Sequence, residues 1–219
     1  MKLHGQLCRA WVITAKDMRT YYLKPPLISW GILFPAVMAL VFYLRSPDDA
    51  RRIVPGLVGM TVLFGATSME AVVIAFEKRI GAMERLLIAP IATWALVLGK
   101  ATSGMFFGTA MGFLVWVASL LVWGGPLKLL AVLPVLILGS WAFACMGVVI
   151  SLMMREVFDA MAMANVFRFP MVFLGGVFTP LTTLPGWLRI VATLLPLSYV
   201  VDALTAVHVG ADEAVFAPW

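Results

Sequence analysis

Charged residues are scarce in this chain: Asp, Glu, Lys and Arg make up 12% of its 219 residues, whereas hydrophobic residues make up 63%. No polar stretch is long enough to fold as a soluble domain, which excludes a catalytic or nucleotide-binding domain within this sequence. The apolar residues instead form repeated runs of roughly twenty, the length that crosses a hydrocarbon core about 30 Å thick. Because lone strands cannot satisfy their backbone in lipid, the runs are expected to be helical. The sequence therefore predicts an all-α, polytopic membrane protein with a single transmembrane domain, residues 1–219.

Cysteine and histidine are equally rare. The two cysteines, Cys8 and Cys145, fall in a basic N-terminal arm and inside an apolar run, and His4 and His208 are isolated. A structural disulfide or a metal site needs such residues in clusters, so the sequence predicts neither.

Nucleotide-binding and catalytic motifs are also missing. The segment that begins at Gly99-Lys100 resembles the end of a phosphate-binding loop, but Trp94 stands where the first glycine of that motif is required. The serines within apolar runs have no histidine or aspartate beside them and are typical of helix packing: Ser103, Ser119, Ser140 and Ser151. We therefore expect no catalytic residue, no bound cofactor and no enzymatic activity in this chain.

The N-terminus is basic and amphipathic. Residues 1–26 carry lysines and arginines among apolar residues that recur near helical spacing, and the segment closes with Pro25-Pro26. This pattern predicts a helix that lies on the membrane face with its cations toward lipid headgroups. It differs from a cleavable signal, which would have a compact apolar core. A disordered basic tail is the alternative.

Five apolar runs are long enough to span a membrane, namely residues 27–44, 53–76, 101–123, 129–154 and 160–179. Lysine and arginine are more numerous in the N-terminal arm, in residues 77–100 and at Arg155 than in the segments on the opposite side. The positive-inside rule therefore places the N-terminus and the 77–100 region in the cytoplasm.

Beyond the fifth run the apolar pieces shorten to about a dozen residues, 184–195 and 197–209. Such lengths are typical of re-entrant or interfacial helices rather than spans. We predict an external re-entrant helical hairpin over residues 181–209. Its marker residues are three prolines and two interfacial aromatics: Pro180, Pro185, Pro196, Trp187 and Tyr199.

A charged stretch, residues 77–90, separates the second and third apolar runs. Drawn as a helix, it places an apolar stripe toward the membrane helices: Ile80, Met83 and Leu87. The opposite stripe would face solvent or a partner: Glu77, Gly81, Glu84 and Arg85. An ordinary loop with snorkelling charges is the alternative.

Two blocks of sequence resemble the membrane subunits of type-2 ATP-binding-cassette exporters. One block comprises residues 77–91 followed by Gly99-Lys100, and is similar to the cytoplasmic segment of that family. The other block is similar to the family's fifth span and external hairpin: Asn165, Phe169-Pro170, residues 173–181, Leu184-Pro185-Gly186-Trp187, residues 195–199 and Asp202-Ala203-Leu204. Both blocks occur in the family's order and spacing across most of the chain.

The resemblance implies the permease half of an ATP-driven exporter in the cell (inner) membrane. Two copies, or one copy and a paralogous permease, would form the path among membrane lipids, and a separate cytoplasmic ATPase would bind ATP and magnesium; no nucleic acid is expected. The residues that match the ATPase-coupling helix, 77–91, are Glu77, Arg79, Gly81, Glu84 and Arg85. The family pattern also implies outward transport of an amphiphile, such as a drug, lipid or lipid-linked glycan. It further implies a sixth span after the hairpin, where this sequence ends.

Two ionisable residues, Glu70 and Arg168, lie inside apolar runs. At 1.5 Å per residue both fall roughly 9–14 Å from the cytoplasmic ends of their helices. A charge at that depth usually faces a partner or a wet cavity, so the two are predicted to pair or to line the translocation path, with snorkelling as the third possibility.

Glycine recurs every four residues in the third run, at Gly104, Gly108 and Gly112. Such a stripe lets another helix approach closely in lipid, either from the same subunit or from its twin. The main functional alternative to an exporter is an ATP-independent channel or membrane scaffold, in which Glu70 and Arg168 would line a pore.

Overall fold

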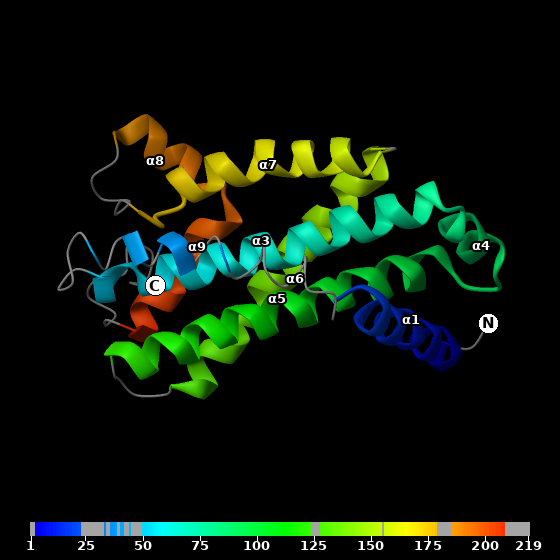
Figure 1. Ribbon diagram of the computed structural model, residues 1–219, viewed down its shortest axis with the longest axis horizontal. Helices are drawn as coiled ribbons and strands as arrows, with labels where there is room; N and C mark the ends of the chain where they lie inside the picture. The colour runs from blue at the N-terminus through cyan, green and yellow to red at the C-terminus, as the bar shows by residue number, and fades with distance from the viewer. Residues whose placement is uncertain are drawn as a thin grey trace.

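The computed structural model is a bundle of helices whose long axes run roughly side by side (Figure 1). It describes residues 3–22, 33, 36–38, 40, 41, 44, 50–123, 128–154, 156–178 and 185–208. Every regular element within these ranges is a helix, which confirms the predicted all-α class.

Four helices in the described ranges are long and apolar enough to cross a membrane: α3 (Ala50–Arg79), α5 (Thr93–Trp123), α6 (Leu129–Met153) and α7 (Val157–Leu174). They coincide with four of the predicted spans, which are thereby confirmed. The remaining predicted span, residues 27–44, falls almost entirely outside the described residues. α3 is longer than predicted because its charged ends continue as helix, and α5 because the mostly apolar residues 93–100 before the predicted span are also helical.

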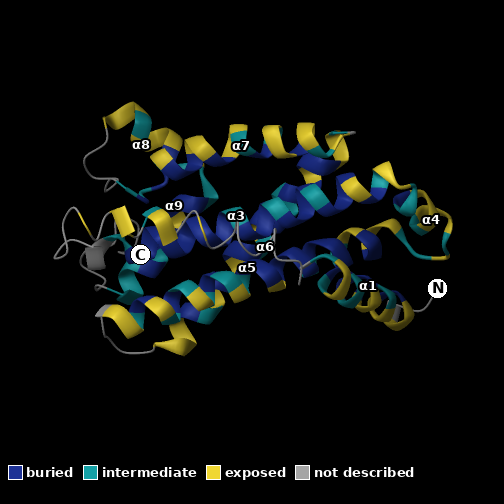
Figure 2. Ribbon diagram, in the orientation of Figure 1, coloured by how far each residue is buried: buried dark blue, intermediate teal, exposed yellow. Residues whose placement is uncertain are grey.

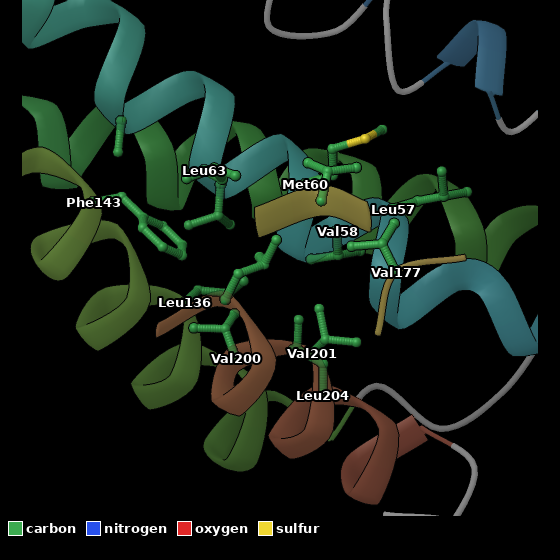
Figure 3. Close-up of a cluster of buried hydrophobic side chains, with 14 of the residues drawn as sticks. Leu57, Val58, Met60, Leu63, Leu136, Phe143, Val177, Val200, Val201 and Leu204 are labelled. Atoms are coloured by element: carbon green, nitrogen blue, oxygen red, sulfur yellow. The ribbon is translucent and has the colours of Figure 1, made fainter. Parts of the chain in front are cut away.

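α3 is the central helix of the bundle. It is largely buried, whereas α5, α6 and α7 each leave a broad apolar face exposed (Figure 2). Its side chains Leu57, Val58 and Leu63 pack in one cluster with Leu136 of α6 and Val200 of α9 (Figure 3). Between helices in lipid, close van der Waals packing of this kind replaces the hydrophobic effect as the main source of association.

The glycine stripe of α5 lies against α3 and α6. A Cβ added to Gly108 would lie 2.8 Å from Cβ of Ala66 on α3 and 3.0 Å from Oγ of Ser140 on α6. Gly104 and Gly112 meet the same two helices at similarly close range. The predicted stripe therefore faces helices of its own subunit, which answers the question that the sequence left open.

After α7 the chain forms two short helices, α8 (Gly186–Thr193) and α9 (Pro196–His208), bent by 91°. Ser198 donates its hydroxyl to the carbonyl of Ala192 and Tyr199 donates to that of Thr193, each at 2.7 Å, so side chains at the start of α9 hold the end of α8. Pro196 opens α9, where a missing backbone N–H costs no helical hydrogen bond. These two helices lie within the predicted hairpin. Pro185 precedes α8 and Trp187 is exposed on it, whereas Pro180 lies outside the described residues.

The opposite end of the bundle carries α1 (Leu3–Asp17) and α4 (Ala82–Ile88) (Figure 1). α1 continues into a π-helical turn, η1 (Met18–Tyr22), so the predicted N-terminal helix is two elements, and Pro25-Pro26 lie outside the described residues. The helix predicted for residues 77–91 is also divided. α3 runs on to Arg79, and Gly81 then takes a φ of 68° before α4 begins. This left-handed conformation suits glycine and breaks the helix.

Candidate functional site

Four charged side chains meet where α1, α3 and α5 come together. Lys100 of α5 has its Nζ 2.8 Å from Oδ2 of Asp17 and 2.6 Å from Oε2 of Glu77. Lys16 approaches the same two carboxylates: its Nζ lies 3.0 Å from Oδ1 of Asp17 and donates a hydrogen bond to Oε1 of Glu77. Asp17, Glu77 and Lys100 are buried, and Lys16 is partly exposed. We call these four residues the charge junction.

The charge junction is electrically balanced, with two ammonium groups and two carboxylates. Burying an ion costs several kcal/mol in proteins, so the mutual attraction and hydrogen bonds of the four groups must offset that cost. Burial by itself lowers the pKa of Lys16, but the hydrogen bond to Glu77 and the charge of Asp17 outweigh it and raise the pKa above its usual 10.5. Burial raises the pKa of Tyr21, and the charge of Glu77 raises it further. Both groups therefore keep their protons at neutral pH.

α1 is also attached to the turn between α4 and α5. Arg9 donates from Nη1 to the carbonyl of Pro90. Oε1 of Gln6 accepts a hydrogen bond from the backbone N–H of Ala92 at 2.9 Å. These bonds satisfy the Pro90 carbonyl and the Ala92 N–H of the turn. The position of α1 and the path of the chain leaving α4 therefore depend on each other.

α5 lets α1 approach closely at Gly99. A Cβ at this residue would lie 2.7 Å from the carbonyl oxygen of Ala10, and Thr14 donates its hydroxyl to the Gly99 carbonyl at 2.9 Å. The face of α1 that turns away from the protein is apolar, with large side chains that are 44%, 59% and 65% exposed: Leu7, Trp11 and Val12. The buried side of α1 thus combines polar residues, among them Thr14 and Asp17, with Ile13, whereas its exposed large hydrophobic residues face outward.

α4 and the residues just before it present a mixed apolar and charged surface. Ile80, Leu87 and Ile88 are 52%, 57% and 86% exposed. We call this surface the exposed tip. It comprises six exposed residues: Arg79, Ile80, Glu84, Arg85, Leu87 and Ile88. Met83 lies on the other side of α4 and packs with Ile13 of α1 and Leu96 of α5.

The predicted apolar stripe of the charged stretch was therefore wrong in phase. Of Ile80, Met83 and Leu87, only Met83 is buried. The break at Gly81 is the physical reason: residues before it belong to the register of α3 and residues after it to that of α4. A stripe drawn through one continuous helix mixes the two registers.

The predicted ATPase-coupling residues consequently separate into two groups. Arg79, Glu84 and Arg85 are exposed, and Gly81 makes the break between helices. Glu77, predicted on the same exposed stripe, is instead buried in the charge junction. An exposed Glu77 was therefore a wrong prediction, since α3 turns that position toward α1 and α5.

Sequence reasoning did not identify the partners of Glu77, nor the role of Lys78. Nζ of Lys78 donates to three carbonyls at the end of α6, those of Ser151 at 2.6 Å and of Leu152 and Met154 at 3.1 Å. The last carbonyls of a helix lack intrahelical donors, and a lysine there satisfies them. Their positions in the sequence could have indicated such contacts, because Lys78 and Lys100 each lie near the end of an apolar run.

Glu70 and Arg168 do not form the predicted ion pair in the described part of the chain. Glu70 accepts a hydrogen bond from Ser103 of α5 at 3.0 Å, and its side chain lies beside Gly104 and Gly147. Arg168 approaches α3 from α7. The two residues are at comparable depth, as predicted, but they face different neighbours of α3.

Within the described ranges, no group of three or more His, Cys, Asp or Glu side chains could hold a metal ion. The features that the structure shows at the α1–α4 end are ion pairs, loop hydrogen bonds and an exposed surface. Such a set can transmit force or bind a partner.

Comparison with known proteins decides the family. The family model described as ABC-2 type transporter matches residues 9–208. The chain belongs to the ABC-2 type transporter family. The predicted resemblance is thereby confirmed, and with its apolar helices the chain is a multi-pass membrane permease subunit of this family.

Two relatives of this ABC-2 type chain come from Escherichia coli strain K12. The protein named "Inner membrane transport permease YadH" is 27% identical over 221 residues, which cover 94% of this chain and 79% of YadH. The protein named "Probable multidrug ABC transporter permease YbhR" is 22% identical over 171 residues, which cover 76% of this chain and 46% of YbhR. The match thus spans about half the length of YbhR.

Proposed function

We propose that this chain is the permease subunit of an exporter driven by a separate ATPase, which binds ATP and magnesium and pushes on the exposed tip. The observation that carries the proposal is that the exposed tip and the charge junction lie at the same end of the bundle. The tip offers three exposed aliphatic side chains beside three charged ones, a surface suited to a partner. No catalytic group is needed in the permease for this task.

The contacts of the tip support a mechanical role. α4 leads directly into the turn that Arg9 and Gln6 hold, and that turn leads into α5. Lys100 then joins α5 to α1 and to the end of α3. A displacement of α4 would therefore reach α1, α3 and α5 together.

The proposed location is the cell (inner) membrane, with the N-terminus and the exposed tip in the cytoplasm. α1 and α4 lie at the same end of the bundle, as a shared cytoplasmic side requires (Figure 1). YadH, by its name an inner membrane transport permease, supports this location. A second copy or a paralogous permease would complete the path, with lipid around the exposed faces of α5, α6 and α7.

The proposed cargo is an amphiphile that leaves the cytoplasmic side. YbhR is named a probable multidrug ABC transporter permease, and this name supports a drug-like cargo for this chain. The exposed aromatic and aliphatic side chains of α7, among them Phe167 and Phe173, are compatible with a greasy substrate and equally with lipid.

The test is co-purification of the chain with ATPases encoded beside its gene. We compare wild type, the charge-reversed double variant Glu84→Lys/Arg85→Glu, and Arg189→Glu as a control at the opposite end of the bundle. We expect a stable wild-type complex with ATPase activity, loss of that complex in the double variant, and no change in the control. Binding of every ATPase by the double variant as tightly as by wild type would remove the exposed tip from the mechanism. Failure of wild type to bind any ATPase would favour an ATP-independent channel or scaffold.

A further inference from the structure

α7 buries a narrow stripe of side chains against the bundle, and one of them is charged. The stripe contains Ala160, Ala164, Arg168, Met171 and Val172. The two alanines pack with Ala71, Ala75 and Ile150 in a small apolar cluster. Arg168 is 3% exposed, so its guanidinium occupies a position where the rest of the stripe is apolar.

Only part of the Arg168 guanidinium is satisfied by the protein. Nε donates to Oγ1 of Thr67 at 2.6 Å, and Nη1 donates to Oδ1 of Asn165 at 3.1 Å. The guanidinium carbon lies 5.3 Å from the ring centre of Phe64. Nη2 is buried and has no hydrogen-bond partner among the described residues. Neutral groups therefore engage Nε and Nη1, and the N–H donors of Nη2 are left unsatisfied.

The positive charge is not neutralised by any carboxylate of the described ranges within ion-pair distance. A buried guanidinium in a membrane span is costly without an anion, and planar guanidinium is the side chain best suited to binding carboxylate or phosphate oxygens. Glu70 accepts its hydrogen bond from Ser103 of α5 and forms no ion pair with Arg168 in the described ranges. An oxyanion of a bound ligand would supply the counter-charge that the described carboxylates do not.

The surroundings of Arg168 fit an anion that carries an apolar body. Phe64 and Phe169 form an edge-to-face pair with ring centres 6.4 Å apart beside the guanidinium. Phe167 and Phe169, the sequence neighbours of Arg168, are each 47% exposed on the outer side of α7. An oxyanion at Nη2 would thus sit beside an aromatic surface that reaches the exterior of the subunit.

We propose that Arg168, positioned by Thr67 and Asn165 at the α3–α7 seam, binds the anionic headgroup of an amphiphile, a phosphate or carboxylate whose apolar part lies along Phe64 and Phe169. This inference rests on the proposed function, because it names the cargo class of the same permease. Thr67 and Asn165 are positioning residues, and Arg168 makes the contact.

The test measures binding to the purified full chain in neutral maltoside micelles, so it does not need an ATPase. The probes are tetradecyl phosphate, tetradecylphosphocholine and inorganic phosphate. We expect wild type to prefer tetradecyl phosphate over tetradecylphosphocholine by about tenfold or more, because the quaternary ammonium of the phosphocholine offsets the negative charge that Arg168 would neutralise. Arg168→Gln should lose this preference, and Arg189→Gln, which alters an arginine of α8 at the far end of the bundle, should keep it.

Arg168→Lys provides a variant that keeps the buried charge if the glutamine variant does not fold. It should also lose about tenfold in affinity for tetradecyl phosphate, because lysine has no counterpart of the unsatisfied Nη2 donors. Equal wild-type affinity for the two amphiphiles, or an unchanged preference in the Arg168 variants, would overturn the proposal. Inorganic phosphate binding as tightly as tetradecyl phosphate would overturn the amphiphile assignment. Failure to bind an ATPase in the co-purification experiment refutes the proposed function separately from these results.

Discussion

At the scale of single residues, a substitution in the charge junction is expected to lower the free energy of unfolding more than a substitution of a surface charge. Each of its buried ions is stable because the others are present, so the four groups depend on one another more than ordinary surface pairs do. An exposed ion pair contributes about 0–1 kcal/mol, whereas removing one partner of a buried pair leaves an uncompensated charge. Lys100 is the most sensitive to this effect, since it contacts both carboxylates while itself buried.

Replacing Lys100 by methionine is expected to destabilise the fold by about 3–5 kcal/mol, the cost of stranding a buried partner. The measurement is unfolding of the purified chain in mixed detergent micelles. Lys128→Met is the matched control, because Lys128 is an exposed lysine with a hydrogen bond to the carbonyl of Val207, and it should cost about 1 kcal/mol or less. Adding Glu77→Gln to Lys100→Met restores neutrality and should recover part of the loss. Equal losses for Lys100→Met and Lys128→Met would contradict this account.

At the scale of elements, close approach between helices adds to the polar contacts that hold the long helices together. The stripe of α5 shows this most clearly, because all three glycines meet side chains of α3 and α6. Small residues allow such contacts in lipid, where no hydrophobic effect draws helices together. Glycine itself lowers helix stability, so its presence here reflects packing.

We expect Gly108→Ala to destabilise the bundle by about 1–3 kcal/mol through overpacking, although alanine favours helix by about 1 kcal/mol over glycine. The control is Gly186→Ala in α8, where an added Cβ meets nothing within 4 Å. That variant should be neutral or slightly stabilised. Unfolding in mixed micelles distinguishes the two, and a Gly108→Ala protein as stable as the control would contradict the packing of α5 described above.

At the scale of the whole molecule, the bundle has one end built for rigidity. α1, the turn after α4, the start of α5 and the end of α3 are connected by ion pairs and loop hydrogen bonds. At the other end, α8 and α9 meet at a bend of 91° held by two side-chain hydrogen bonds. A push on the exposed tip should therefore move the first group as one body.

This expectation can be tested by tying α1 to the turn. In a chain lacking its native cysteines, Gln6→Cys and Ala92→Cys place thiols at two residues that share a hydrogen bond. Once the disulfide forms, ATP-driven transport should stay within about twofold of the reduced protein, because elements that move together lose nothing when joined. The reduced double variant is the control. Transport that stops on oxidation and returns on reduction would mean that α1 and the turn move apart in each cycle.

The sequence was sufficient for the spans but not for their contacts. The four long helices were predicted because membrane thickness fixes the length of an apolar run. The exposed stripe of α4 was not predicted correctly, because a single glycine, Gly81, changes the register between two helices. The pairing of Glu70 with Arg168 failed for a related reason. Depth along a helix follows from counting residues, whereas the direction around it depends on which neighbour packs on each face.

The arrangement of α1 has a consequence for how this helix meets the membrane. A peripheral amphipathic helix buries its apolar side in lipid and keeps its polar side in water, so it can bind the membrane reversibly. α1 has its polar side, including Thr14 and Asp17, committed to the protein, and its apolar side, including Trp11, turned outward. Detaching it would strand buried charges on both sides of the separation. We therefore expect α1 to stay attached to the subunit, so that it meets the bilayer as a fixed part of the subunit surface rather than as a reversibly bound helix.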